Sequence, residues 1–332
     1  MDRRVRERAR AQSVRGLRQP GIRIRQASDP FVALLARDFQ QIGFTGFFCL
    51  DVHGMDLVSI VETSTLSCAE KMEQQIQFDN HVGETLAGTL HQPEQPPVGA
   101  IVAGHCFTCS RHTGVLRRIC NALGEAGFMA LRFDFSGNGQ SQGRFEQSTW
   151  TKQILEMEAA IELVQKKGAS WIGLAGHSLG AAIALLTARR TKTVSAVCRV
   201  AGRVSATRSM HFLTPLQQRT LEQTGYVEFN SRARQLTLNR DFFDDADRHD
   251  LTEATRSLTI PMLVVHGDRD EIIPVSEAHL AKSANPRMVE LAIISGGDHM
   301  LAHPDHQRQA ARVVTDWFCR QVGVPAPADR NR

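Results

Sequence analysis

Short apolar runs alternate with longer amphipathic stretches along most of the chain that follows residue 72. A continuous apolar run of about four to eight residues indicates a strand buried on both faces, whereas apolar residues three and four apart indicate a helix. These runs predict strands at 73–78, 85–90, 98–103, 128–135, 171–175, 194–200, 260–266 and 287–294. The amphipathic stretches predict helices at 116–126, 150–167, 181–190 and 306–322.

This regular alternation of strand and helix predicts an α/β fold, in which helices flank both faces of a mainly parallel sheet. One interval breaks the alternation, because residues 203–259 are too many for a plain connection in a compact domain. Two apolar segments there, 227–229 and 235–238, flank a polar stretch and predict a small hairpin, followed by a short acidic helix around 244–248. We therefore predict an α/β domain over 71–323 with a cap inserted at 203–259, and a flexible tail at 324–332.

Positive charge is concentrated at the N-terminus. Residues 1–28 hold nine arginines and two acidic residues, a net charge of +7, while the rest of the chain carries 30 basic and 33 acidic residues, a net charge of −3. The body of the protein thus has no basic surplus that would favour nucleic acid. The arm itself has three interpretations: a targeting segment, a tail for nucleic acid or membrane surfaces, or a disordered extension without a role. We expect 1–70 to be a poorly ordered extension, although 31–39 have the spacing of an amphipathic helix.

Membrane and disulfide signals are weak. The first 28 residues lack the apolar region of a secretory signal, and the uncharged stretch 39–50 is shorter than the roughly 20 residues of a membrane-spanning helix. The seven cysteines are odd in number and scattered, which favours reduced thiols over a disulfide framework. We expect a cytoplasmic protein without stable membrane association, and the oligomeric state stays open.

The strongest candidate for chemistry is Gly176-His177-Ser178-Leu179-Gly180, which joins a predicted strand to a predicted helix. A G-x-S-x-G sequence in this context is typical of a nucleophile elbow, a sharp turn that holds the serine side chain out alone. The glycines two residues on either side leave room for the strained turn.

Two later segments supply partners for Ser178. Asp270 follows the 260–266 strand, and His299 follows the last strand within a glycine-rich turn. A histidine can remove the serine proton during attack, and a carboxylate can fix the histidine tautomer. We predict a Ser178–His299–Asp270 triad, with His177 and His266 as weaker candidates for the base. The competing candidates for the acid are Asp268 and Asp298.

A serine nucleophile also needs donors for the oxyanion that develops on the substrate. The backbone N–H of Leu179, at the start of the elbow helix, is one predicted donor. The second is predicted in the loop after the 98–103 strand, at the backbone N–H of Phe107, unless that loop only packs against the elbow. Residues 134–141 lack the third glycine of a dinucleotide motif, so we interpret them as a structural turn and not a nucleotide site.

Taken together, these motifs resemble those of the α/β-hydrolase family over about residues 72–323. Three segments are closer to one subgroup, the hydrolase domain found fused to peroxidase domains of the OsmC (osmotically inducible protein C) type: 104–110, 132–135 and 239–245. The resemblance implies a carboxylesterase-like enzyme that cleaves small-molecule esters or related acyl bonds with Ser178, Asp270 and His299. It also implies no metal and no organic cofactor. Relatives have His-Gly where this chain has His105-Cys106, which leaves the oxyanion geometry open.

Other functions remain alternatives at this stage. The same three side chains could serve peptide hydrolysis or acyl transfer, and a hydrolase fold can also be a non-catalytic binding protein. Cys106 and Cys109 form a C-x-x-C pair after a strand, which makes them a possible redox pair or regulatory disulfide.

Overall fold

The computed structural model describes residues 48–52, 55–59, 73–205 and 209–326. The chain divides into two compact units, Met1–Cys68 and Ala69–Arg332. Within the first unit, β1 (Phe48–Val52) and β2 (Met55–Ser59) pair as an antiparallel hairpin. The extension predicted as poorly ordered thus contains one strand pair, whereas the helix predicted at 31–39 lies outside the described residues.

The second unit is built around an eight-stranded sheet of order β12-β11-β8-β7-β5-β6-β4-β3. Strands β3 and β4 join antiparallel, and β4 also runs antiparallel to β6, whereas the other neighbours are parallel. The strand bounds are β3 Glu73–Asp79, β4 Thr85–His91, β5 Ala100–Gly104, β6 Met129–Phe133, β7 Ile172–His177, β8 Val194–Val200, β11 Met262–Gly267 and β12 Val289–Ile294. The prediction of a mainly parallel sheet is confirmed, and β8 has the predicted bounds.

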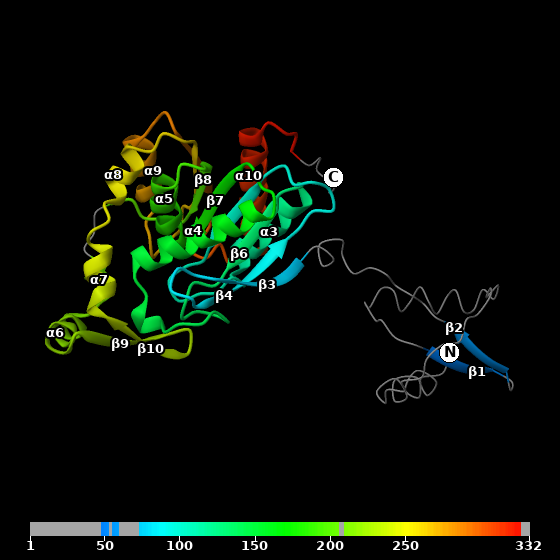
Figure 1. Cartoon of the computed structure of the whole chain (residues 1–332), viewed down its shortest axis with the longest axis horizontal. Coiled ribbons are helices and arrows are strands. Elements are labelled where there is room, and N and C mark those ends of the chain that lie inside the picture. Colours follow the sequence, from blue (N-terminus) through cyan, green and yellow to red (C-terminus); the bar gives the residue numbers. More distant parts are fainter. Residues whose placement is uncertain (1–47, 53–54, 60–72, 206–208, 327–332) are drawn as a thin grey trace. The chain divides into compact units, whose positions relative to one another are not determined.

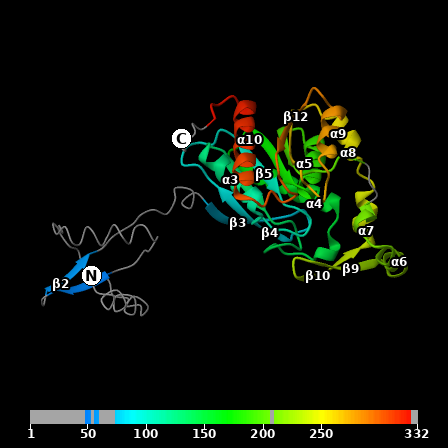
Figure 2. The same cartoon turned by 180° about the vertical axis from the view of Figure 1, so that it is seen from behind.

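Helices cover both faces of this sheet (Figure 1). One face carries α4 (Trp150–Lys166), α5 (Leu179–Arg190), α8 (Leu251–Arg256) and α9 (Ser276–Ala284). The other face carries α3 (Gly114–Glu125) and α10 (Pro304–Val322), which lie in front when the molecule is seen from behind (Figure 2). Strand residues alternate between the two cores, so that Val102 packs on the first face and Ala103 on the second. This is the α/β-hydrolase fold.

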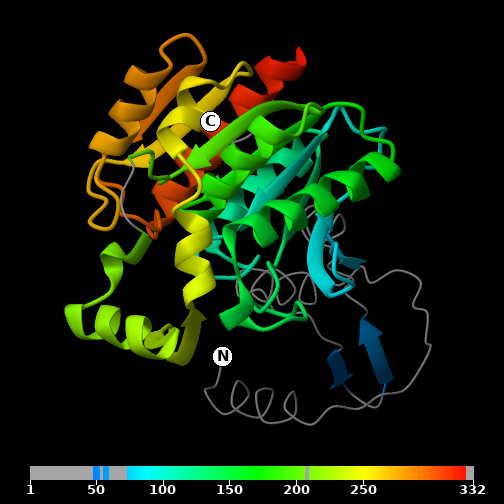
Figure 3. The same ribbon diagram turned by 60° about the vertical axis from the view of Figure 1, so that its left-hand side comes forward.

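The inserted segment lies at one end of the sheet (Figure 3), and its apolar side chains form a separate cluster together with Phe145. Its elements are η3 (Ser209–Phe212), α6 (Pro215–Thr224), β9 (Tyr226–Ser231), β10 (Arg234–Asn239) and α7 (Arg240–Ala246). We call these elements, residues 209–246, the cap. The predicted hairpin is present, as β9 and β10. The acidic helix predicted around 244–248 is observed as α7 at Arg240–Ala246. It begins about four residues earlier than predicted, directly after Asn239. Helices α6, α8 and α9 were not predicted.

The start of the insertion is tied to the body by a buried carboxylate. Glu277 on α9 accepts hydrogen bonds from the backbone N–H groups of Val204 and Ser205, each at 2.7 Å, and from the Ser205 hydroxyl. Thr252 donates to the Val204 carbonyl at 2.8 Å. Charge-assisted bonds of this kind hold the chain firmly where it leaves the sheet.

Residues 134–141 form a turn that is held by contacts within the protein, as predicted for a structural turn. Asp134 is fully buried; it accepts from the Gln140 backbone at 2.9 Å and pairs with the Arg111 guanidinium. A Cβ at Gly139 would overlap the Asp134 carboxylate, which explains glycine at this position of φ +54°. Across the described residues, no helix combines the length and apolar character needed to cross a membrane.

Candidate functional site

Ser178 lies at a strained turn between β7 and α5. Its backbone has φ 54° and ψ −114°, a conformation that L-residues rarely adopt, and its N–H donates to the Val200 carbonyl at 2.9 Å. A Cβ at Gly176 would lie 2.1 Å from the Gly180 carbonyl oxygen, and one at Gly180 would lie 2.2 Å from the Gly104 oxygen. Both glycines are therefore required by backbone contacts, as the elbow motif indicates.

The structure brings Ser178, His299 and Asp270 together in one chain of hydrogen bonds. The Nε2 atom of His299 lies 3.0 Å from the Ser178 Oγ, and its Nδ1 lies 2.8 Å from the Asp270 Oδ2. Asp270 follows β11, and His299 follows β12, so the carboxyl ends of neighbouring parallel strands deliver the acid and the base. The His299 side chain is 13% exposed, which leaves it accessible from the site, whereas the Asp270 side chain is fully buried.

Asp270 is held as a carboxylate by several donors. Its Oδ1 accepts from the backbone N–H groups of Ile272 at 2.9 Å and Ile273 at 2.8 Å. Its Oδ2 lies 3.3 Å from the Nε2 of His266. Burial on its own would raise the pKa of Asp270, but the hydrogen bonds from His266, His299 and the Ile273 backbone outweigh it and keep this pKa well below its usual range. The charge needed to orient His299 is thus present at neutral pH.

His177, inside the elbow, supports the backbone of His299. Its Nε2 lies 2.8 Å from the His299 carbonyl oxygen and donates to it, and the two rings are 5.1 Å apart. Burial, with the nearby His299 as a smaller cause, lowers the pKa of His177 to about 4. His177 is therefore a neutral packing residue beside the serine and does not reach the Ser178 hydroxyl as a base. The sequence alone gave no sign of this bond.

The competing acids have other partners. Asp268 Oδ1 accepts from the Gly296 N–H at 2.6 Å, and Asp298 Oδ1 accepts from the Ala302 N–H at 2.8 Å. Both carboxylates therefore brace the turns on either side of His299. His266 also donates to the Ile273 carbonyl at 2.8 Å, which fixes the loop that carries Asp270.

The two proposed oxyanion donors belong to loops that meet at the elbow. Leu179 is the first residue of α5, where the backbone N–H has no partner within the helix. Phe107 lies in the loop after β5, which is braced by His105: its Nδ1 donates to the Cys106 carbonyl at 2.7 Å, and its Nε2 accepts from the Phe135 N–H at 3.0 Å.

Cys106 and Cys109, on either side of Phe107 and Thr108, are paired as a disulfide with a Cα–Cα distance of 5.3 Å. Both cysteines are buried. This pairing differs from the expectation of reduced thiols, which spacing across the whole chain suggested. The local C-x-x-C spacing is the signal that did indicate it. Cys120, Cys198 and Cys319 are free and buried.

The Phe107 side chain joins the loop to the cap. Its ring centroid lies 5.2–5.9 Å from four other phenylalanine rings: Phe145, Phe212, Phe229 and Phe242. Three of these rings belong to the cap, and Met210 packs against the same cluster. The predicted second oxyanion donor thus belongs to a residue whose side chain packs in an aromatic cluster. Nowhere in the described part of the chain do three His, Cys, Asp or Glu side chains gather as a metal site would require.

Comparison with known families and curated proteins finds a peptidase family, a thioesterase and a protein named as a phosphoribosyl transferase. The profile of the family described as serine aminopeptidase, S33, matches residues 95–254, a segment that holds Ser178 but ends before Asp270 and His299. The palmitoyl-protein thioesterase ABHD10, mitochondrial, of Mus musculus is 26% identical over 196 residues, which are 56% of this chain and 63% of that protein. A Mycobacterium tuberculosis protein named as a phosphoribosyl transferase is 23% identical over 248 residues, 73% of this chain but 45% of that protein. The chain therefore spans less than two thirds of either relative.

Solved structures are similar over most of the second unit. The esterase domain of a Rhodothermus marinus protein is 27% identical, with a TM-score of 0.62, and the match covers 76% of this chain and 99% of that domain. Est1E from Butyrivibrio proteoclasticus, solved with ferulic acid bound, has a TM-score of 0.63 at 22% identity over 75% of this chain and 99% of its own. The narrower likeness to OsmC-fused hydrolases stays a prediction. The chain therefore has the α/β-hydrolase fold, and it is similar to proteins described as a serine aminopeptidase, a thioesterase and esterases.

Proposed function

We propose that this protein is an esterase that uses Ser178 as nucleophile, His299 as general base and Asp270 as the acid that orients it. The observation that carries the proposal is the continuous hydrogen-bond chain from Ser178 Oγ through both His299 nitrogens to a buried carboxylate. This is the geometry in which a serine hydroxyl becomes reactive at neutral pH.

The reaction proceeds in two halves. Ser178 Oγ attacks the ester carbonyl carbon while its proton passes to His299 Nε2, and the negative oxygen is bound by the N–H groups of Leu179 and Phe107. The intermediate collapses, the bond to the alcohol breaks, and His299 returns the proton to the departing alkoxide. Water then attacks the acyl-enzyme with the same proton transfers, which releases the acid and restores Ser178.

We propose a small ester with an apolar or aromatic acyl group as substrate. Phe107 and Phe229 are half-buried and Phe212 is exposed, so these rings offer an apolar surface for the acyl group beside the proposed donor. Apolar walls with a few fixed polar donors are the usual composition of such sites. Est1E, which is similar in fold, binds the aromatic acid ferulic acid, and this supports an aromatic acyl group in the substrate proposed here.

Two other acyl bonds are supported by particular similarities. A thioester is favoured by the thioesterase ABHD10, and a peptide bond by the family profile. All three reactions share the same acyl-enzyme, so the leaving group distinguishes them.

The test is a panel of substrates that share one acyl group: a 4-nitrophenyl ester, an alkyl thioester and an aminoacyl amide. We expect the ester to be cleaved with the highest kcat/KM, and the Ser178→Ala variant to lose cleavage of every substrate. A higher kcat/KM for the thioester or the amide would show that this substrate, and not the ester, is the preferred class. Unchanged rates in Ser178→Ala would overturn the mechanism.

We also propose that the redox state of Cys106 and Cys109 changes the esterase activity, because their disulfide closes the loop that contains Phe107. Reduction would loosen the loop that presents one oxyanion donor. Ester hydrolysis by oxidised protein, reduced protein and Cys109→Ser measures this directly. Identical kcat/KM in all three would show that the pair has no regulatory role.

A further inference from the structure

The tip of the cap hairpin has an unusual sequence for its shape. Strands β9 and β10 are joined by only two residues, Arg232 and Ala233, since Ser231 already pairs with Arg234. Both residues have positive φ, 50° and 57°. Two-residue turns of this kind strongly favour Asn-Gly, because other side chains are strained there. Neither Arg232 nor Ala233 is a residue that stabilises such a turn, which leaves room for a role of the arginine side chain.

This hairpin tip, residues 231–234, touches the loops on both sides of the proposed site. The Ser231 and Thr108 hydroxyls are 2.8 Å apart, and the Arg234 guanidinium donates to the Thr108 carbonyl at 3.0 Å. On the other side, Arg232 Nη2 lies 3.7 Å from the Met300 sulfur. Thr108 is the neighbour of Phe107, and Met300 is the neighbour of His299. The tip therefore bridges the loops of the oxyanion donor and of the general base.

The charge of Arg232 lacks a counter-ion within the described residues. Its guanidinium lies against the Met300 thioether, which carries no charge, and no carboxylate of the described part of the chain lies within ion-pair distance. Arg240, elsewhere in the cap, also has no ion pair among the described residues, but its guanidinium donates to the carbonyls of Leu221 and Glu222, each at 2.8 Å, whereas Arg232 has no oxygen partner there. The positive charge of Arg232 also reaches the elbow, where it adds to burial in lowering the pKa of His177.

We propose that Arg232 binds a carboxylate of the substrate, so that the preferred esters carry a negative charge a few bonds from the scissile carbonyl. A guanidinium with free donors beside a partly apolar site binds a carboxylate in a defined geometry. The inference rests on the proposed esterase function and narrows its substrate class. Arg232 is thus a specificity-determining residue that the reaction itself does not require.

The experiment compares charged and neutral esters that are matched in shape. Mono-4-nitrophenyl adipate and 4-nitrophenyl hexanoate differ by a carboxylate on the acyl side, while 4-acetoxybenzoate and 4-acetoxybenzamide differ by one on the alcohol side. Arg232→Gln is expected to lower kcat/KM about tenfold for the charged member of at least one pair, mainly through KM, as expected for one hydrogen bond to a charged group. The neutral members should change by less than about twofold. Arg232→Lys should restore part of the loss.

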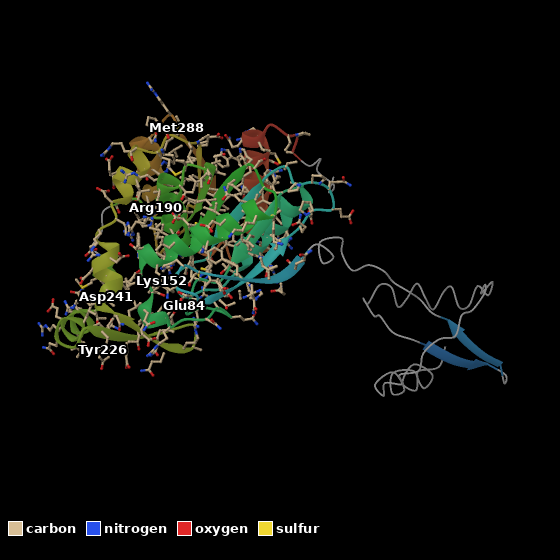
Figure 4. The ribbon with its side chains drawn as sticks, in the orientation of Figure 1. Glu84, Lys152, Arg190, Tyr226, Asp241 and Met288 are labelled. Carbon is tan, nitrogen blue, oxygen red and sulfur yellow. A yellow bond between two sulfur atoms is a disulfide. The ribbon has the colours of Figure 1, made fainter. Side chains whose placement is uncertain are left out.

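Arg287→Gln is the matched control, because it removes the same charge from an exposed position. Figure 4 labels its neighbour Met288 at the top of the second unit and the cap residue Tyr226 at the bottom of that unit. Equal losses on charged and neutral esters in Arg232→Gln would show a structural role and overturn the proposal. No loss on either charged ester would show that Arg232 is only a solvated surface residue. If the wild type cleaves the neutral esters in either case, the esterase function stands; if it cleaves none of the four, both proposals fail.

Discussion

Different contacts stabilise two regions of the molecule: the cap, and the turns at the carboxyl ends of the parallel strands, which we call the rim. At the rim, Gly176 and Gly180 meet backbone carbonyls so closely that no Cβ fits, and Asp270 is fixed by two backbone N–H groups. In the cap, the main contacts are between phenylalanine rings, and α6 adds a capping box at Thr214. Backbone contacts fix positions to a fraction of an ångström, whereas aromatic packing tolerates exchange of one apolar side chain for another.

The difference corresponds to the roles that we propose for the two regions. Proton transfer between Ser178 and His299 needs hydrogen-bond distances, so the rim admits little variation. Selection of a substrate needs a surface of suitable size and charge, which many sequences supply. Substitutions at the rim should therefore lower kcat strongly. They should also lower the free energy of unfolding more than substitutions in the cap do.

The largest effect is expected for His299→Ala. Loss of the general base should lower kcat for ester hydrolysis on the order of 10⁶-fold, without a comparable change in thermal stability. Stopped assays at high enzyme concentration, with a melting curve as the folding control, measure both. A variant that retains a tenth of the activity would mean that another group removes the serine proton.

Asp270→Asn comes next, with an expected loss of about 10⁴-fold in kcat, because an amide cannot hold His299 in the required tautomer. Asp268→Asn is the matched control. Its Oδ1 can still accept from Gly296, so less than a tenfold loss is expected. Equal losses of kcat in the two variants would show that Asp270 is not the particular carboxylate that orients His299.

Two glycine substitutions test rim against cap directly. Gly180→Ala places a Cβ 2.2 Å from a backbone oxygen and should lower the free energy of unfolding by about 3 kcal/mol or more. Gly225→Ala, at the end of α6, has φ +80° but open space around it, and should cost only about 1–2 kcal/mol. Chemical denaturation measures both. A larger loss at Gly225 would reverse the comparison.

An effect similar in size to that of Gly225→Ala is expected for the dependence of stability on pH through His177. Its pKa in the folded state is about 4, below the ordinary 6.5, so between these values the unfolded chain binds a proton that the folded chain does not. Stability is therefore retained above pH 6.5 and falls as the pH drops toward 4, by on the order of 2 kcal/mol between pH 7 and pH 5. His91, whose pKa burial also lowers to about 4, acts in the same direction.

His177→Gln should make this decline shallower, because glutamine does not titrate. The exposed His279→Gln serves as control and should leave the slope unchanged. Denaturation midpoints across this pH range report the slopes. Parallel curves for the wild type and His177→Gln would exclude His177 as a source of the acid sensitivity.

Much of the fold could be predicted, because the strands are apolar runs and the long helices have clear periodicity. Strand β8 is a good example, since Val194–Val200 is buried almost throughout. Helix α6 was missed because its Leu221 is the one buried residue among ten, so periodicity is nearly absent. The Thr214-Pro215 start and Gln217 are a capping signal that could have found it.

The elbow and its partners were predictable since each follows a strand end in a recognisable turn. The supporting residues were not. Nothing local to Glu277 indicates that it holds the backbone at Val204, and nothing local to His177 indicates its bond to His299. These contacts join segments more than 70 residues apart, and only the packing of the sheet brings them together.

The most direct test of the account is covalent labelling with a fluorophosphonate, which reacts with a serine only when a base activates it. We expect one label on the wild-type protein, mapped by mass spectrometry to the peptide containing Ser178. We expect none on Ser178→Ala and greatly slowed labelling of His299→Ala. Label on another serine, or equal labelling of the wild type and Ser178→Ala, would contradict it.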